Sequence, residues 1–192
     1  MLDFKTIYLI LTVLAGLLFV VFLTYEYYER KTGVPTFPTM PPVRRRIAAK
    51  LQAELKRTGQ QPFRVLDLGS GSGQLGFTIA RAIPAAAVTG IELSYIPWLR
   101  SVIRQRLWGV KNLTYLRQDF WPYDISQFDA VVTYLPGTIM EKVGDKLHRE
   151  LKPGTLIIAN VFALRAGWEP IESLDIKFYL FFKTKLFVYR KV

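Results

Sequence analysis

The pattern of apolar positions divides the chain into an unbroken N-terminal run and a longer region in which apolar and polar residues alternate. The run covers residues 7–24. A helix of about 18 residues is about 27 Å long, close to the hydrocarbon thickness of a bilayer. Tyr25, Tyr27 and Tyr28 follow it, as aromatic residues do at a membrane interface. We expect residues 1–31 to form a retained single-pass anchor. A cleaved signal peptide is the alternative, but the run is long for that class and no small-x-small cleavage pattern follows it.

Basic residues gather on the C-terminal side of this run. Asp3 and Lys5 nearly cancel before it, whereas cations accumulate after it at Arg30, Lys31, Arg44, Arg45, Arg46 and Lys50. The positive-inside bias predicts that the rest of the chain lies on the cytoplasmic side, or on the matrix side of a mitochondrial inner membrane. The net charge of +11 also indicates an anionic neighbour, which is a membrane surface, nucleic acid or an acidic protein face.

A proline-rich stretch at residues 32–42 separates the anchor from the remaining chain. Proline fixes φ and removes amide donors, so we expect a non-helical connector, acting either as a spacer or as a flap over a ligand. Residues 43–192 are long enough for one domain with a real core. Its first predicted element is a helix over residues 43–57, whose four-residue spacing places these residues on one inner face: Val43, Ile47, Leu51 and Leu55.

Strand and helix patterns then alternate along the domain. Strands are predicted at residues 65–68, 87–91, 113–118, 129–134 and 156–161, with helices over 74–83 and 97–108 and a third after the fourth strand. The tail over residues 176–192 predicts an antiparallel hairpin that turns at residues 183–185. In the helix over 97–108 the residues expected to face inward are Leu99, Val102, Ile103 and Leu107. In the third helix they are Met140, Val143, Leu147 and Leu151.

The most informative stretch is residues 65–73, which joins the first strand to the helix after it. Gly69, Gly71 and Gly73 permit a tight turn and let a ligand lie against bare backbone. Free N–H groups at the start of the next helix would face that ligand. Residues 71–76 also match the dinucleotide pattern G-x-G-x-x-G, which is a weak signal alone. On this pattern an NAD(P)-binding oxidoreductase and a non-catalytic nucleotide-binding module both stay open.

An acid ends the first strand and another ends the second. Asp67 precedes the glycines, and Glu92 lies about 20 residues beyond them. A carboxylate at the second position accepts hydrogen bonds from both hydroxyls of a ribose. This acid indicates a nucleoside ligand without identifying the cofactor.

The residues Asp67-Leu68-Gly69-Ser70-Gly71-Ser72-Gly73 resemble the first motif of class I S-adenosylmethionine-dependent methyltransferases. The order of strands, helices and strand-end acids fits the same class. The resemblance implies an α/β fold: a Rossmann-like seven-stranded class I methyltransferase sheet with a terminal antiparallel hairpin, preceded here by one N-terminal transmembrane helix.

Several shorter motifs narrow this resemblance. They resemble the small membrane-anchored lysine methyltransferases that act on ATP synthase c subunit and adenine nucleotide translocase, and their prokaryotic relatives. The motifs are the proline-rich connector, Gly90-Ile91-Glu92-Leu93, Tyr134-Leu135-Pro136, Leu151-Lys152-Pro153-Gly154-Thr155 and Trp168-Glu169-Pro170. That group usually has Gly-Asp-Gly-Arg where this chain has Gly71-Ser72-Gly73-Gln74. The cofactor contacts of the loop, and the target, can therefore differ.

The resemblance implies S-adenosyl-L-methionine as the cofactor and a set of residues that bind it. These are Asp67, Gly69, Ser70, Gly71 and Gly73 in the loop, Glu92 and Leu93 after the second strand, and Asp119 and Phe120 after the third. Asp119 would accept from the adenine amino group and Phe120 would border the ring. A turn acid followed by core aromatics is the alternative for these last two residues.

Tyr134 and Pro136 end the fourth strand, where the reactive methyl group of the cofactor would lie. We expect them to shape an apolar channel for a lysine, with Tyr134 orienting the amine. The alternative is a tyrosine that simply packs under the loop. The chemistry requires no metal, and His148, the only histidine, is expected to be a surface residue.

The sequence therefore predicts an S-adenosylmethionine-dependent lysine N-methyltransferase that works at a bilayer on a membrane-associated protein. A methyltransferase for a lipid, a quinone or another small molecule is the alternative. A nucleic-acid substrate is disfavoured because no base-stacking platform is evident and an anchor would restrict access.

Overall fold

The computed structural model describes residues 3–32, 38–165, 167–178 and 182–192, with side chains throughout except at 24–26, 28–32, 178 and 182. The chain forms two compact units, Met1–Thr36 and Phe37–Val192. The predicted interfacial tyrosines Tyr25 and Tyr28, the cations Arg30 and Lys31, and most of the predicted connector lie outside the described side chains or residues.

The first unit contains helix α1 (Phe4–Thr32). Its apolar part, Phe4–Leu23, has 20 residues and a mean hydropathy of 2.7, and no part of it is buried within the protein. Length and composition allow this helix to cross a membrane. A signal sequence has the same two properties, so the helix by itself shows only the capacity to span.

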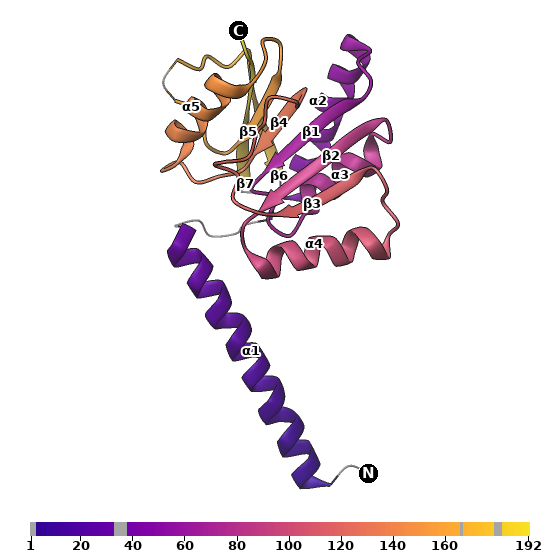
Figure 1. Ribbon diagram of the computed structural model, residues 1–192, viewed down its shortest axis with the longest axis vertical. Helices are drawn as coiled ribbons and strands as arrows, with labels where there is room; N and C mark the ends of the chain where they lie inside the picture. Colours follow the sequence, from indigo (N-terminus) through magenta and orange to yellow (C-terminus); the bar gives the residue numbers. More distant parts are fainter. Residues whose placement is uncertain (1–2, 33–37, 166, 179–181) are drawn as a thin grey trace. The chain divides into compact units, whose positions relative to one another are not determined.

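The second unit is a seven-stranded mixed sheet with helices on both faces (Figure 1). The strands are β1 (Phe63–Leu68), β2 (Ala86–Glu92), β3 (Leu113–Arg117), β4 (Ala130–Thr133), β5 (Leu156–Asn160), β6 (Glu172–Phe178) and β7 (Phe182–Arg190). Their order is β3-β2-β1-β4-β5-β7-β6. Strands β1 to β5 are parallel, and β7 pairs antiparallel with both β5 and β6. The predicted sheet and its terminal hairpin are confirmed.

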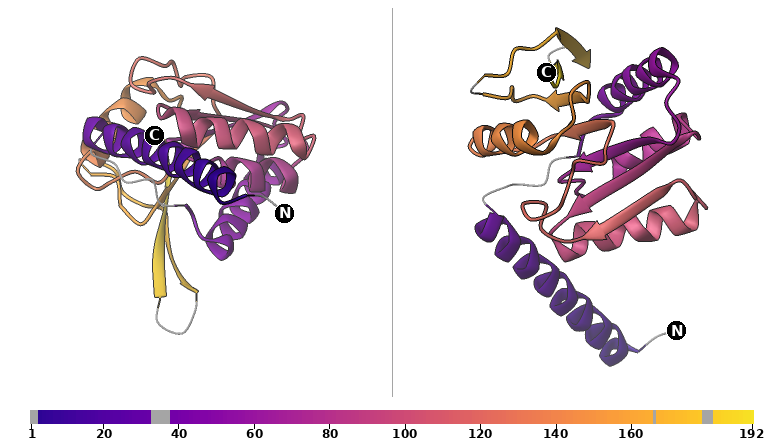
Figure 2. Two further views of the ribbon diagram at one scale, coloured as in Figure 1. Left: turned by 90° about the horizontal axis from the view of Figure 1, so that it is seen from below. Right: turned by 45° about the horizontal axis from the view of Figure 1, so that its top comes forward.

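The helices are α2 (Pro41–Thr58), α3 (Gln74–Ala82), α4 (Tyr95–Leu107) and α5 (Met140–Glu150). Helices α2, α3 and α4 pack on one face of the sheet, and α5 packs on the other (Figure 2). Alternate residues of β1 enter the two cores: Phe63 and Val65 on the first face, Leu66 and Leu68 on the second. The buried residues of this central strand are therefore apolar except for Asp67, and only Arg64 is exposed. Parallel strands that are covered on both faces have such apolar runs.

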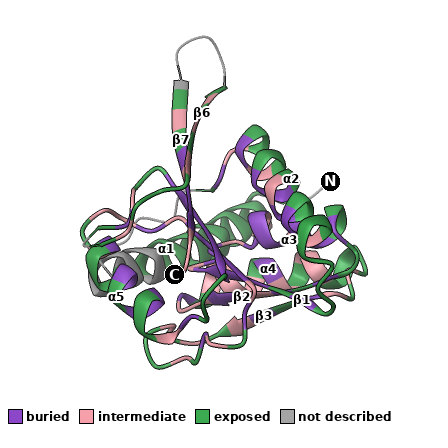
Figure 3. Cartoon of the chain, turned by 90° about the horizontal axis from the view of Figure 1, so that it is seen from above, coloured by how far each residue is buried: buried purple, intermediate pink, exposed green. Residues whose placement is uncertain are grey.

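Two boundaries differ from the sequence prediction. Pro41 and Pro42, assigned to the connector, form the first turn of α2, where a missing amide donor costs nothing. Strand β6 ends at Phe178 and β7 begins at Phe182, so the predicted turn residues 183–185 lie within β7. A lysine-rich segment can pair as a strand there because its side chains alternate along an exposed ribbon that extends past the sheet (Figure 3).

Helix α4 contradicts most of the predicted inner face. Val102 is partly buried and packs against the first core as predicted, but Leu99 is only partly buried, Ile103 is 48% exposed and Leu107 is 79% exposed. The side that meets the sheet instead carries Trp98, Ser101 and Gln105. The Trp98 indole donates to the carbonyl of Tyr115 at 3.2 Å, and the Gln105 amide donates to the carbonyl of Leu113. Side chains that donate hydrogen bonds to β3 therefore occupy inner positions of the helix. The spacing of apolar residues along the sequence does not predict this arrangement.

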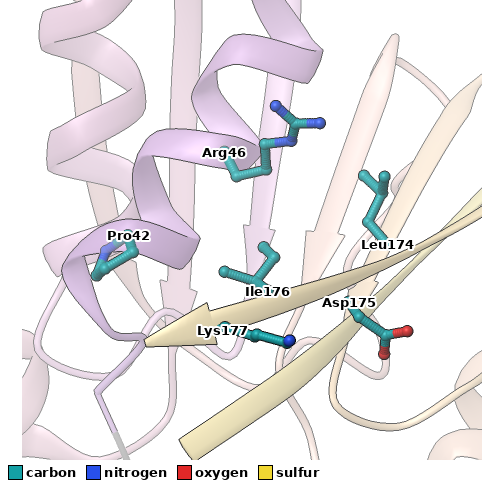
Figure 4. A pocket seen from close by; sticks show the side chains of 6 residues that line it. All are labelled: Pro42, Arg46, Leu174, Asp175, Ile176 and Lys177. Carbon is teal, nitrogen blue, oxygen red and sulfur yellow. The ribbon is translucent and has the colours of Figure 1, made fainter. Parts of the chain in front are cut away.

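A shallow hollow of about 290 Å³ lies between α2 and β6 (Figure 4). It is lined by Pro42 and Arg46 of α2 and by Leu174, Asp175, Ile176 and Lys177 of β6. None of the residues predicted to bind the cofactor lines it. The candidate site lies instead at the carboxyl ends of β1, β2 and β4.

Candidate active site

The glycine loop leaves β1 at Leu68 with left-handed backbone at three positions. The φ angles are +75° at Gly69, +53° at Gly71 and +73° at Gly73. A Cβ on Gly69 would lie 2.7 Å from Leu135 Cδ2, and one on Gly73 would lie 2.5 Å from Ser101 Cβ. The loop therefore requires glycine for its backbone conformation and for close approach to its neighbours.

Asp67 lies beneath this loop, and its side chain is buried. Its Oδ2 accepts a hydrogen bond from the N–H of Gly76 at 3.1 Å, which ties the end of β1 to the first turn of α3. Burial raises the pKa of Asp67 to about 7; the Gly76 N–H opposes the shift and the charge of Glu92 adds to it. In this geometry Asp67 supports the loop from below.

Tyr115 of β3 is a supporting residue that the sequence prediction missed. Its side chain is buried, and its hydroxyl donates to the carbonyl of Gly73. Burial is the main cause that raises the pKa of Tyr115, with Asp67 second. A tyrosine at an inward position of a strand reads as a core residue, and only its contact with Gly73 reveals the role in the loop.

Glu92 ends β2 and points at the loop. Its Oε2 accepts the N–H of Gly71 at 2.9 Å, and its Oε1 accepts the N–H of Ser94 at 2.7 Å. Each carboxylate oxygen has a second lone pair, so both can accept a further donor. The carboxylate is partly exposed and held in one orientation, which fits recognition of a vicinal diol. Leu93 follows it and is partly buried.

Asp119 and Phe120 follow β3 and adjoin the end of β2. The N–H of Gln118 donates to the carbonyl of Glu92 at 3.1 Å, which brings the two strand ends together. Asp119 is exposed and accepts the N–H of Trp121 at 3.0 Å. The Phe120 ring is partly buried, packs against the second core and lies 4.7 Å from the Trp121 ring. The backbone thus brings Asp119 beside Glu92, while Phe120 also serves as a core residue.

Tyr134 and Pro136 follow β4 on either side of Leu135. Leu135 is buried and packs against Gly69, so this segment borders the glycine loop. Tyr134 is partly buried, and burial raises the pKa of its hydroxyl. The Pro136 carbonyl accepts the N–H of Ile139, which fixes the turn into α5.

Arg44 of α2 also reaches the loop, although the sequence places it only among the cations that follow the apolar run. Its guanidinium donates to Oε1 of Gln74, which with Ser72 is one of the two residues that depart from the usual motif. Arg44 is partly buried, and this burial lowers the pKa of Arg44, followed by the charges of Arg104 and Arg45. A cation from another helix therefore stands beside the first residue of α3.

The chemistry of these residues suits an adenosine with a charged tail. The glycine backbone and the oriented Glu92 carboxylate meet at the Gly71 N–H, and Arg44 is near the start of α3. Two hydroxyls at this edge, Ser70 Oγ and Thr133 Oγ1, are buried without a hydrogen-bond partner within the described protein. His148 is exposed on α5, on the other face of the sheet, and stands edge-on to Trp168. The described residues contain no group of three His, Asp or Glu side chains placed to hold a metal.

A family model described as the ANTKMT methyltransferase domain matches residues 67–172, which include the glycine loop, Glu92, Asp119 and Tyr134. The chain belongs to this family. It is an S-adenosylmethionine-dependent methyltransferase, which decides between the two cofactor classes that the glycine pattern left open.

Individual relatives agree with the family. This methyltransferase is 29% identical over 150 residues to a protein-lysine N-methyltransferase of Saccharolobus islandicus (strain REY15A), covering 75% of this chain and 86% of that protein. It is 28% identical over 114 residues to the adenine nucleotide translocase lysine N-methyltransferase of Mus musculus, covering 58% of this chain and 48% of the mouse protein. The chain thus spans about half the length of the mouse relative.

The fold agrees with solved structures. An RNA methyltransferase from Salinibacter ruber, in complex with S-adenosyl-L-homocysteine, has a TM-score of 0.64 to this methyltransferase at 22% identity. The match covers 80% of this chain and 93% of the other. At this identity the likeness supports the class I fold and carries no statement about substrate.

Proposed function

We propose that this methyltransferase transfers the methyl group of S-adenosyl-L-methionine to a lysine side chain of a membrane-associated protein. The observation that carries the proposal is the Glu92 carboxylate, which two backbone N–H groups hold against the glycine loop. It supports a ribose site at the edge where β4 also ends. Two relatives named as lysine N-methyltransferases support the acceptor class.

The cofactor residues have separate roles in this proposal. Gly69, Ser70, Gly71 and Gly73 would line the amino-acid end of the cofactor, with Asp67 supporting them. Glu92 would accept both ribose hydroxyls, with Leu93 beside the sugar. Asp119 would accept from the adenine amino group, and Phe120 would border the base.

When bound, the cofactor supplies a methyl group on a positively charged sulfur, and the lysine nitrogen displaces that sulfur after losing its proton. A free lysine has a pKa of about 10.4, and an apolar surrounding lowers it because the charged form loses hydration. Tyr134 and Pro136 would provide that surrounding. The raised pKa of Tyr134 keeps its hydroxyl protonated at neutral pH, so it would orient the amine by hydrogen bonding.

Membrane attachment is the second part of the proposal. Residues 1–31 would form a single-pass anchor, residues 32–40 a connector, and the catalytic domain would begin with α2 at Pro41, on the cytoplasmic or matrix side. The apolar helix α1 supports this arrangement. Tethering raises the effective concentration of acceptors in the same bilayer.

Labelled S-adenosyl-L-methionine, incubated with the full chain and membranes from its own source, tests the acceptor. We expect label in protein, recovered as N-methyllysine by mass spectrometry. Label in the lipid fraction would replace the proposal with the lipid or quinone alternative. Calorimetric titration with S-adenosyl-L-methionine and with NAD controls for cofactor binding.

The role of Tyr134 predicts a turnover defect. Tyr134→Phe keeps the ring and removes the hydroxyl, so we expect turnover to fall about five- to tenfold, the effect of one hydrogen bond, with unchanged cofactor affinity. Tyr123→Phe is the matched control, since Tyr123 is also partly buried and packs near Phe128. Unchanged turnover in Tyr134→Phe would remove this hydroxyl from the mechanism.

A further inference from the structure

The outer side of α4 is apolar. Ile96, Leu99, Ile103 and Leu107 recur at intervals of three or four residues and so share one side of the helix. Ile103 and Leu107 are well exposed, and Trp108 at the end of the helix is 66% exposed. We refer to Ile96, Leu99, Ile103, Leu107 and Trp108 as the α4 stripe.

Within the described part of the protein, Trp108 contacts α3, where its ring stands edge-on to Phe77, whereas Ile103 and Leu107 stay exposed. Figures 1 and 2 show α4 along the outer side of β3, which is the edge strand of the sheet. Its inner residues already bond to that strand through Trp98 and Gln105. Exposed apolar side chains grouped on one helix face mark an interaction surface more often than singly scattered ones do.

Charge identifies the kind of surface that the stripe fits. At about 3.6 residues per turn, the exposed Arg100 and Arg106 lie on opposite sides of the stripe. Lys111 follows the helix, and no Asp or Glu occurs between Glu92 and Asp119. An apolar face flanked by arginines and free of acids is the pattern of a helix that lies in the interface of an anionic bilayer.

We propose that the α4 stripe docks the catalytic domain onto an anionic lipid surface. Leu107 and Ile103 would enter the headgroup region, Trp108 would lie at the interface, and Arg100 and Arg106 would contact lipid phosphates. The chain also carries an apolar helix long enough to span a bilayer, which supports a lipid partner over a protein partner. The proposal concerns the domain surface and is independent of the methyl acceptor.

Docking through α4 would bring the bilayer close to the cofactor site. Helix α4 begins at Tyr95, directly after Ser94, whose N–H holds the Glu92 carboxylate. A lipid surface along α4 would therefore lie beside the edge where the ribose is proposed to bind. This favours acceptors whose lysine lies within a few residues of the membrane surface.

Single-cysteine labelling tests the proposal on the full chain, because the sequence has no cysteine. Leu107→Cys carries a nitroxide on the stripe, and Glu141→Cys carries one at an exposed position of α5 on the opposite face. Each protein is reconstituted into phosphatidylcholine vesicles with and without phosphatidylserine. Collision rates of the nitroxide with oxygen and with a water-soluble nickel chelate report lipid and water exposure.

We expect the Leu107→Cys label to gain oxygen collisions and lose nickel collisions only in vesicles that contain phosphatidylserine, while the Glu141→Cys label stays aqueous. Adding Arg100→Gln and Arg106→Gln should lower the ratio of docked to free domain about fivefold per arginine. A label at 107 that stays aqueous in all vesicles overturns the proposal. So does equal insertion without phosphatidylserine. Shielding from both reagents, in detergent as in vesicles, would assign the stripe to a protein contact instead.

Discussion

Helices α2 and α4 lie on the same face of the sheet and have similar composition, yet their apolar sides point in opposite directions. In α2, Val43, Ile47 and Leu51 are at most 1% exposed, and Arg45 and Arg46 face outward. In α4, Ile103 and Leu107 face outward between arginines. Helix α2 packs between α3 and β6, whereas α4 packs on the edge strand β3 and the neighbouring β2. Periodicity predicts that a helix is amphipathic, and the neighbours decide which side is the inner one.

The largest expected difference between the two helices is in stability. Leu51→Ala leaves a cavity in a closed core and should lower the free energy of unfolding by about 2–5 kcal/mol. Leu107→Ala removes an exposed side chain and should change it by less than about 0.5 kcal/mol. Urea unfolding of both variants in mild detergent, followed by circular dichroism, measures the two values. Comparable losses would show that the α4 stripe belongs to the core.

A second difference is the ion pair that fixes α2 to the sheet. Both oxygens of the nearly buried Glu54 accept hydrogen bonds from Arg57 and from Arg190 of β7, at 2.7–3.0 Å. These bonds, Arg57 first and Arg190 next, lower the pKa of Glu54 to about 2. Glu54→Gln should cost about 2 kcal/mol at neutral pH, the value of hydrogen bonds to a charged group.

The effect of Glu54→Gln on stability should depend on pH. Because the folded-state pKa of Glu54 is lowered from 4.5 to about 2, its contribution is present above pH 4.5 and is lost as the pH falls toward 2. The stability gap between the native chain and Glu54→Gln should therefore close over this range. The exposed Glu141→Gln is the control. A gap that persists at pH 2 would contradict the ion-pair account.

A smaller effect separates two adjacent arginines within α2. Arg44 donates to Gln74 at the start of α3, whereas Arg45 is exposed. If Arg44 serves the charged tail of the cofactor, Arg44→Gln should raise the KM for S-adenosyl-L-methionine by about ten- to thirtyfold, the effect of about one hydrogen bond to a charged group. Arg45→Gln should leave it unchanged. Equal KM values in the two variants would limit Arg44 to a surface role.

The features that the sequence predicted are those set by local chemistry. The glycine loop could be predicted because only glycine fits its positive φ angles. Strand β1 could be predicted because both of its faces are buried, which requires an apolar run. The acid Glu92 follows from its spacing to the loop. The match over residues 67–172 and the sheet order agree with the resemblance drawn from these motifs.

The features that the sequence did not predict depend on contacts between distant segments. Tyr115 supports Gly73 from β3, and Arg44 reaches Gln74 from α2. From the neighbouring sequence alone, Tyr115 looks like an ordinary core residue and Arg44 looks like one cation of a charged helix face. The outward orientation of the apolar side of α4 also depends on a distant segment. Gln105 faces inward, where its side-chain amide donates a hydrogen bond to the carbonyl of Leu113.

The most direct test of the account is calorimetric titration of S-adenosyl-L-methionine into variants of Glu92. We predict that Glu92→Ala raises the Kd at least about tenfold, because both ribose hydroxyls lose their acceptor. Glu92→Gln, which keeps one acceptor oxygen, should give an intermediate loss, and the control Glu141→Ala should give none. A native Kd in Glu92→Ala, with the fold intact by circular dichroism, would contradict the proposed ribose site and the cofactor geometry built on it.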